Sequence, residues 1–157
     1  MRQAAREITD LIQIEAVFQM ATVCRLAFWD DEYPYIVPLN FGYAARVLYF
    51  HCALEGKKID LISKNPHVGF ELEGIAEIVP RAENACSWSA KYQSVIGKGT
   101  AMILTDPAAK RQALGIIMAH YAGLGRKWEF PEEHLGKMLA LRVEIEEMTG
   151  KQSKEFL

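Results

Sequence analysis

The amino-acid sequence predicts a mainly β protein, an antiparallel barrel or sheet with helices at its periphery. About seven runs are rich in β-branched and aromatic residues, and most of them follow one another through short polar turns. Roughly three or four other segments carry apolar residues at helical spacing. Half of the 157 residues are hydrophobic, which is enough for one core, so we expect a single domain over residues 1–157.

The N-terminal part is predicted to form a helix followed by a β-hairpin. Asp10 can cap a helix in which apolar residues, including Ile14 and Phe18, recur at spacings of three and four residues. Residues 21–29 and 33–42 read as strands. The short acidic segment between them suits a turn, so the two strands should pair as a hairpin.

The middle of the chain is predicted to alternate strands with one short helix. Residues 46–51 form a third strand, rich in β-branched and aromatic side chains. Residues 55–64 form a short helix, which ends before Pro66 because proline cannot continue it. Residues 68–72 and 75–79 look like a further strand pair that turns at the Glu-Gly pair between them.

The C-terminal part is predicted to hold two strands and a long helix. Residues 94–104 form a long strand, whose two glycines indicate a bulge or a close neighbour. Asp106, followed by proline, opens a helix that runs toward Gly123. Residues 139–145 place two leucines, a valine and an isoleucine on one side and polar residues with an alanine on the other, which predicts a closing strand with one wet face. The polar tail, residues 149–157, is expected to fray.

Composition excludes several classes of function. The formal net charge of -2 gives no basic face for a nucleic-acid backbone. No apolar run approaches the roughly 20 residues needed to cross a bilayer, and the charged N-terminus does not resemble a signal peptide. We therefore expect a cytoplasmic protein with neither a nucleic-acid nor a membrane partner. No metal site is expected, because the histidines are far apart and there is no Cys-x-x-Cys spacing among Cys24, Cys52 and Cys86.

Three features could carry chemistry. Lys57 and Lys58 stand where a helix begins after a strand, a place that favours an anion such as phosphate, although a Lys-Lys pair is also typical of a solvated surface. His51 ends the preceding strand and could be an acid-base group, a metal or haem ligand, or a hydrogen-bonded structural residue. Residues 86–95 set aromatic rings, including Trp88, beside hydroxyls, which suits either a planar ligand or core packing.

Several motifs follow one another in order from about Arg6 to Lys151. They are YPYIVPLNFGY at 33–43, LYFHCALEGKKID at 48–60, NP at 65–66, Trp88, YxSVxGxG at 92–99 and EEMTGK at 146–151. In this order and spacing they resemble the nitroimidazole-resistance (Nim-like) branch of the pyridoxamine 5'-phosphate oxidase-related flavoproteins. The resemblance implies an FMN-binding split β-barrel that forms a homodimer, with FMN in a cleft at the subunit interface.

The resemblance also implies which residues hold FMN. The strand that lies along the isoalloxazine ring comprises Val37, Pro38, Leu39 and Asn40. The phosphate-binding turn comprises His51, Cys52, Ala53, Lys57 and Lys58. The pocket is closed, partly from the second subunit, by Trp88, Ser94 and Val95. His51 is the candidate catalytic residue, since its counterpart in the Nim-like branch lies in the active site.

Two departures argue against the vitamin B6 reaction. True pyridoxamine 5'-phosphate oxidases carry a basic residue and a lysine where this chain has Tyr35 and Asn40, and the C-terminal Arg-x-His motif is absent. The leading hypothesis is an FMN-dependent oxidoreductase that takes electrons from NADH or NADPH and reduces a small oxidised or nitroaromatic substrate. The alternatives are a non-catalytic flavin- or haem-binding protein, acting as a carrier, sensor or store, and a degenerate split barrel with an empty cleft.

Overall fold

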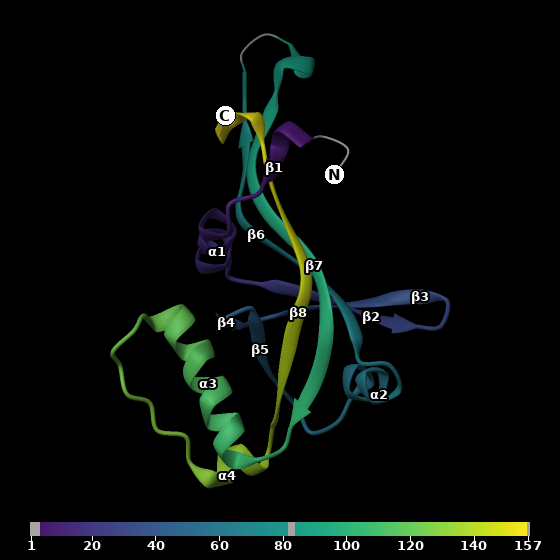
Figure 1. The fold of residues 1–157 in the computed structure, drawn as a ribbon, viewed down its shortest axis with the longest axis vertical. Coiled ribbons are helices and arrows are strands. Elements are labelled where there is room, and N and C mark those ends of the chain that lie inside the picture. Colours follow the sequence, from purple (N-terminus) through teal and green to yellow (C-terminus); the bar gives the residue numbers. More distant parts are fainter. Residues whose placement is uncertain (1–3, 82–83, 157) are drawn as a thin grey trace.

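The computed structural model describes residues 4–81 and 84–156. In this part of the chain an antiparallel sheet is surrounded by four α-helices (Figure 1). The helices are α1 (Leu11–Met20), α2 (Lys57–Lys64), α3 (Pro107–Ala122) and α4 (Glu132–Gly136). The strands are β1 (Glu7–Ile8), β2 (Cys24–Asp30), β3 (Tyr33–Leu39), β4 (Gly42–Ala44), β5 (Val47–Cys52), β6 (His67–Val79), β7 (Ser89–Leu104) and β8 (Leu139–Gln152).

The sheet curls into a barrel that stays open between its two edges. Its strand order is β3-β2-β6-β7-β8-β5-β4, and β1 pairs with the far end of β8. The inner faces of both edge strands belong to one core, against which Val37 and Leu39 of β3 and Tyr43 of β4 all pack. This arrangement confirms the predicted antiparallel barrel with peripheral helices. None of the helices in the described residues is both long and apolar enough to span a membrane.

The predicted helix boundaries are confirmed by their caps. The Asp10 side chain accepts a hydrogen bond of 3.0 Å from the Ile12 N–H, which satisfies a backbone donor in the first turn of α1. The Asp106 side chain accepts one of 2.9 Å from the Ala109 N–H at the start of α3. Gly123, with a φ of 80°, ends α3 in a conformation that favours glycine.

The predicted strand pair at residues 68–72 and 75–79 is wrong, because β6 runs without a turn from His67 to Val79. The register of β6 against β7 shifts between Glu73 and Ile75, so the Glu-Gly pair marks a bulge. A Cβ at Gly74 would lie 3.2 Å from side-chain atoms of Met20 and Val17. A side chain here would crowd α1, which packs closely against the strand, so the glycine marks a close approach and not the turn that the sequence pattern suggested.

The expectation that residues 149–157 fray is also wrong, at least up to residue 152. Thr149–Gln152 form the end of β8, where Gly150 pairs with Ile8 of β1 and with Val95 of β7. Residues 154–156 form a short 3-10 helix, and Leu157 lies outside the described residues. The polar side chains suggested a loose tail, but strand pairing satisfies the backbone groups, whose bonding does not depend on those side chains.

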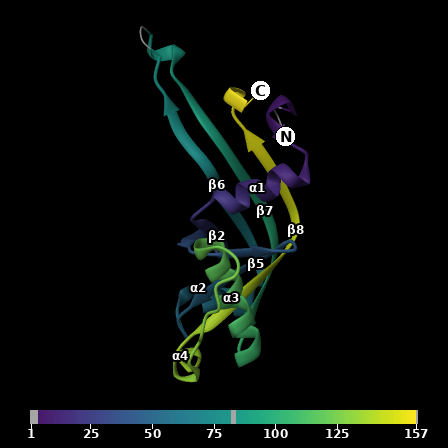
Figure 2. The ribbon, with the colours of Figure 1, turned by 90° about the vertical axis from the view of Figure 1, so that its left-hand side faces the viewer.

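Helix α3 packs against β4, β5 and β8 on the outer side of the barrel, and α4 packs against α3 at the lower end of the molecule (Figures 1 and 2). A small second core lies there, outside the main one, and consists of Ala113, Ile117, Leu135 and Ala140. Ala140 was expected on a wet face and is instead fully buried. The buried Lys110 donates from Nζ to the Leu135 carbonyl at 2.9 Å, which joins α3 to α4.

Candidate cofactor site

The start of α2 has the features of an anion-binding helix N-terminus. Helix α2 begins at Lys57, directly after Gly56, whose φ of 133° suits glycine. No side chain caps this helix. The Ile59 N–H donates to the Gly56 carbonyl at 2.8 Å, whereas the N–H groups of Lys57 and Lys58 have no backbone hydrogen-bond partner in the described part of the chain. Together with the helix dipole, these donors favour a phosphate at this position.

The two lysines of α2 have different surroundings. Lys57 forms an ion pair with Asp30, and its Nζ lies 4.9 Å from the centroid of the Tyr35 ring. The hydrogen bond to Asp30 is the main cause that raises the pKa of Lys57. Lys57 therefore ties the start of α2 to the β2–β3 hairpin, which limits its availability to a ligand.

Lys58 is more available to an anion than Lys57. It is half-buried and has no carboxylate partner among the described residues. It lies near Cys52, whose thiol pKa is raised by burial and lowered to a smaller extent by the Lys58 charge. Cys52 itself packs into the core, and Ala53 is exposed where the chain turns toward α2.

Strand β3 offers a free backbone edge beside α2. It is the last strand on its side of the sheet, within the described residues, and it carries two prolines, which suit an edge because proline cannot donate a ladder hydrogen bond. Val37 and Leu39 are half-buried against the core, whereas Pro38 and Asn40 are exposed. A planar ligand along this edge could use the unpaired backbone groups of these four residues.

The end of β3 is held by α3 through Tyr121. The Tyr121 hydroxyl donates to the Thr22 carbonyl at 2.7 Å. It accepts from the Phe41 N–H at 3.0 Å and from the Asn40 side-chain amide at 3.2 Å. Next to it, the His120 ring nitrogen Nε2 lies 2.7 Å from the Ala21 carbonyl oxygen. Sequence reasoning did not find Tyr121, because Asn40 and Tyr121 are 81 residues apart.

His51 lies at the exposed end of β5. It pairs with Ala140 of β8, and its ring has no hydrogen-bond partner among the described residues. No group of three or more His, Cys, Asp or Glu side chains that could hold a metal ion occurs within residues 4–81 and 84–156. His51, Cys52, Ala53 and the two lysines thus lie together, at the turn from β5 into α2.

The other predicted pocket residues are not brought to this place within one chain. Trp88 is exposed at the outer end of the β6–β7 hairpin, and Figure 1 shows that end at the top of the molecule and α2 in its lower half. Ser94 is half-buried on β7. The Val95 side chain is fully buried in the main core, so it cannot line a cleft with its side chain.

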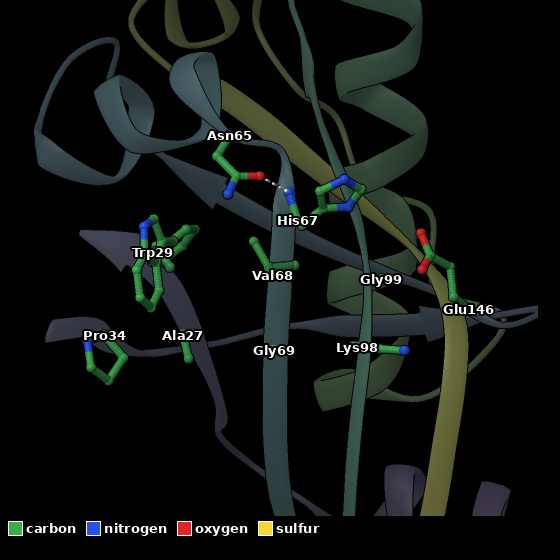
Figure 3. A pocket seen from close by; sticks show the side chains of 11 residues that line it. Ala27, Trp29, Pro34, Asn65, His67, Val68, Gly69, Lys98, Gly99 and Glu146 are labelled. Carbon is green, nitrogen blue, oxygen red and sulfur yellow. Dashed lines mark hydrogen bonds between the residues drawn. The ribbon is translucent and has the colours of Figure 1, made fainter. Parts of the chain in front are cut away.

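Another cavity, of about 530 Å³, lies on the outer face of β2, β6 and β7 (Figure 3). Trp29 stands on one side of it and Glu146 on the other. The Asn65 side chain accepts a hydrogen bond of 3.1 Å from the His67 N–H at its rim. The sequence marked Asn65 only as a helix end, so this cavity was not predicted.

Comparison with known proteins identifies the family. The sequence pattern of the Pyridoxamine 5'-phosphate oxidase family matches residues 11–152, nearly the whole chain. The chain belongs to the pyridoxamine 5'-phosphate oxidase family. This family membership confirms the resemblance stated from the motifs.

Solved structures of the oxidase family share this fold. A candidate 5-nitroimidazole antibiotic resistance protein from Bacteroides thetaiotaomicron is 31% identical, with a TM-score of 0.81 over 93% of this chain and 86% of that chain. An FAD and heme binding protein from Mycobacterium smegmatis has a TM-score of 0.82 at 19% identity, over 95% of this chain and 74% of that chain. An FAD-binding protein from Mesorhizobium loti has a TM-score of 0.66 at 22% identity, over 95% of this chain and 98% of that chain.

One curated protein matches part of this oxidase-family chain. It is an uncharacterized protein of Rhizobium meliloti, 31% identical over 64 residues. The match spans 41% of this chain and 42% of that protein, so it adds no information on activity.

Proposed function

We propose that the chain binds FMN and acts as an oxidoreductase that passes electrons from NADH or NADPH to a small oxidised substrate, such as a nitroaromatic compound. One observation carries the proposal: the uncapped start of α2, where Lys58 stands, contacts Tyr35 of the edge strand β3 through Lys57. The 31% identity to the candidate 5-nitroimidazole resistance protein supports the substrate class. Reduced nicotinamides are abundant in the cytoplasm, where we place the reaction.

The residues fit FMN in the following way. Lys58 and the first-turn N–H groups of α2 bind the phosphate, and the edge of β3 from Val37 to Asn40 orients the ring. Lys57 holds the hairpin against α2 through Asp30, and so fixes the distance between phosphate and ring sites. Bound FMN supplies two-electron chemistry, which no side chain of the protein can provide.

The reaction requires a proton, for which we propose His51 as the donor. Hydride transfer from the nicotinamide supplies two electrons and one proton. Reduction of a nitro group to a nitroso group consumes two electrons and two protons, breaks one N–O bond and releases water. The exposed imidazole of His51, next to the phosphate turn, can carry the second proton from solvent to the substrate oxygen.

We further propose that the protein works as a homodimer with FMN at the subunit interface. Large apolar side chains are exposed on the outer face of the sheet, with exposed fractions between 52% and 58%, and these are Trp29, Ile36, Ile96 and Met102. Exposed apolar surface of this kind is typical of a protein interface. A second subunit would also supply Trp88 and Ser94 to the cleft, which one chain does not bring there.

A non-catalytic flavin- or haem-binding protein is the second candidate. The exposed His51 ring, without a hydrogen-bond partner among the described residues, could serve as an axial haem ligand. An absorbance spectrum of the purified protein separates flavin from haem, since flavin bands and a haem Soret band are distinct. Oxidation of NADH or NADPH by the flavin-loaded protein then separates the oxidoreductase from a non-catalytic flavin-binding protein.

The decisive test is FMN titration of the Lys58→Ala variant. We expect FMN to bind at least about tenfold more weakly, because a charge-assisted phosphate contact is lost. Lys57→Ala should have a smaller effect, and Lys64→Ala, at the other end of the same helix, should have none. Unchanged affinity in Lys58→Ala would contradict the assignment. Absence of NADH or NADPH oxidation with nitroaromatic acceptors would contradict the catalytic part alone.

A further inference from the structure

The outer end of the β6–β7 hairpin carries a polar pocket that shares only Trp88 with the proposed flavin site. Its volume is about 650 Å³, which falls within the range of small-molecule sites. Its walls come from Arg6 of an N-terminal 3-10 helix (Ala4–Arg6), from Arg81 after β6, from a 3-10 helix before β7 (Ala85–Ser87), from β7 and from the C-terminal 3-10 helix. Figure 1 shows that these segments, far apart in sequence, meet at the top of the molecule, whereas α2 lies in its lower half.

Hydrogen bonds between β7 and the C-terminal segment hold the walls of this pocket together. The Ser153 N–H donates to the Tyr92 carbonyl at 2.9 Å, and the Tyr92 N–H donates to the Ser153 hydroxyl at 3.3 Å. Ser153 is buried, with 3% of its surface exposed. The Lys91 Nζ lies 5.0 Å from the centroid of the Phe156 ring. The C-terminal 3-10 helix is therefore pinned to β7, and its side chains are held at the pocket.

The charges on the pocket wall favour an anion. Its cations are Arg6, Arg81 and Lys154, and its carboxylate is Glu155. Arg81 contacts Glu155 at 2.8 Å, and an Arg6 guanidinium nitrogen donates to the Tyr92 hydroxyl at 3.3 Å. A guanidinium has five N–H donors, so one contact leaves most of them available for phosphate oxygens.

An exposed aromatic ring completes the pocket. Trp88 is 56% exposed at its wall, beside the Ser87 and Ser89 side chains. An indole face stacks well on a planar base, and an Arg pair suits the phosphates that a nucleotide carries next to that base. Fatty or simple aromatic ligands fit poorly, because most of the wall is polar or charged.

We propose that this pocket binds the phosphate-bearing part of a nucleotide, with the phosphates at Arg6 and Arg81 and the base against Trp88. In the proposed oxidoreductase this would be the adenosine diphosphate part of the nicotinamide donor, and that role rests on the proposed function. Nucleotide binding itself does not require a working flavin site. The pocket is separate from Lys58 within one chain, so the two sites can be tested independently.

The test is calorimetric titration of the FMN-loaded full chain with ADP-ribose. We expect the unchanged protein to bind ADP-ribose saturably, and to bind adenosine, which has no phosphate, more weakly. The affinity for ADP-ribose should be at least about tenfold lower in Arg81→Gln and in Arg6→Gln. Arg111→Gln is the matched control, because Arg111 is a similarly exposed arginine in an ion pair, with Glu132 on the other side of the molecule. It should bind ADP-ribose like the unchanged protein.

Three outcomes would overturn the pocket assignment. The first is that the unchanged protein does not bind ADP-ribose. The second is that Arg81→Gln and Arg111→Gln bind ADP-ribose with equal affinity. The third is that Arg81→Gln loses affinity for FMN but not for ADP-ribose. Thermal unfolding of each variant checks that it is folded. If ADP-ribose binding follows the arginines but NADH is not oxidised, the pocket stands and the catalytic proposal fails.

Discussion

Two glycines of β7 decide how closely the central strands approach. A Cβ at Gly99 would lie 2.1 Å from the Glu144 carbonyl oxygen, and one at Gly97 would lie 2.4 Å from the Phe70 ring. The predicted bulge or close neighbour is confirmed, since the register of β7 against β8 also shifts between Lys98 and Gly99. Single glycines here determine the packing of the barrel, because no other residue leaves room for the neighbouring strand.

We therefore expect Gly99→Ala to destabilise the fold by about 3 kcal/mol, at the upper end of overpacking effects. Gly115→Ala is the control, because no atom lies within 4 Å of the added Cβ. In the middle of α3 this change should be stabilising by about 0.5–1 kcal/mol. Urea unfolding of both variants measures the difference, and similar stabilities would contradict the structural account.

Tyr121 is a positioning residue, which acts on the candidate cofactor site through Asn40 and the Phe41 N–H. Tyr121→Phe keeps the ring and removes all the hydrogen bonds of the hydroxyl, so we expect a loss of about 1 kcal/mol of stability. Because the end of β3 would then be less firmly held, FMN should bind more weakly and its absorbance bands should shift.

Tyr33→Phe is the control for this variant. The Tyr33 side chain is 73% exposed, and its hydroxyl has no hydrogen-bond partner in the described part of the chain. A flavin spectrum and affinity that change equally in both variants would show that Tyr121 has no special role in holding β3.

Helix α1 closes one side of the barrel and is tied to β4 through Tyr43. The Phe18 and Tyr43 rings stack with centroids 4.1 Å apart, and the Tyr43 hydroxyl donates to Glu15 at 3.1 Å. Burial, and then the Glu15 hydrogen bond, raise the pKa of Tyr43 to about 12. The neutral phenol is therefore favoured in the folded state over the unfolded one, where the pKa is about 10.

This pKa difference predicts a loss of stability at alkaline pH. The contribution of Tyr43 is complete below about pH 10 and is lost as the pH rises through about 12, because only the unfolded state then readily releases the proton. Because Tyr43 is partly exposed and screened by solvent, we expect the free energy of unfolding to fall by only about 1 kcal/mol over this pH range. Unfolding free energies of the unchanged chain and of Tyr43→Phe, measured from pH 9 to 12, should converge by that amount. Parallel curves would contradict the prediction.

Local sequence patterns predicted most helices and strands correctly but failed at Gly74 and at the tail. Caps such as Asp10 and Asp106 act within one turn of helix, so their effect can be recognised in the sequence. The bulge at Gly74 depends on α1, and the order of the tail depends on β1 and β7. Neither partner is adjacent in sequence, so the local pattern did not contain the deciding information.

The whole molecule exposes an apolar face that fits the proposed homodimer. We expect light scattering after size-exclusion chromatography to give a dimer mass for the FMN-loaded chain. Ile96→Glu places a charge on this face and should give monomers with weaker FMN binding. Leu124→Glu is the control, because Leu124 is 93% exposed after α3, away from the sheet face, and this variant should stay dimeric. A monomeric chain with full FMN affinity would contradict the shared cleft.

The sequence alone determined the mainly β fold and the helix caps, and it predicted a phosphate site at the turn from His51 to Lys57 and Lys58, which stays a prediction. These features arise from residues a few positions apart, where spacing and side-chain chemistry suffice. Only the tertiary structure decided that Lys57 binds Asp30, that Val95 faces the core, that Tyr121 holds Asn40, and that both chain ends meet at the hairpin pocket. Each of these contacts joins segments far apart in the chain, and burial and strand pairing bring such segments together only when the barrel forms.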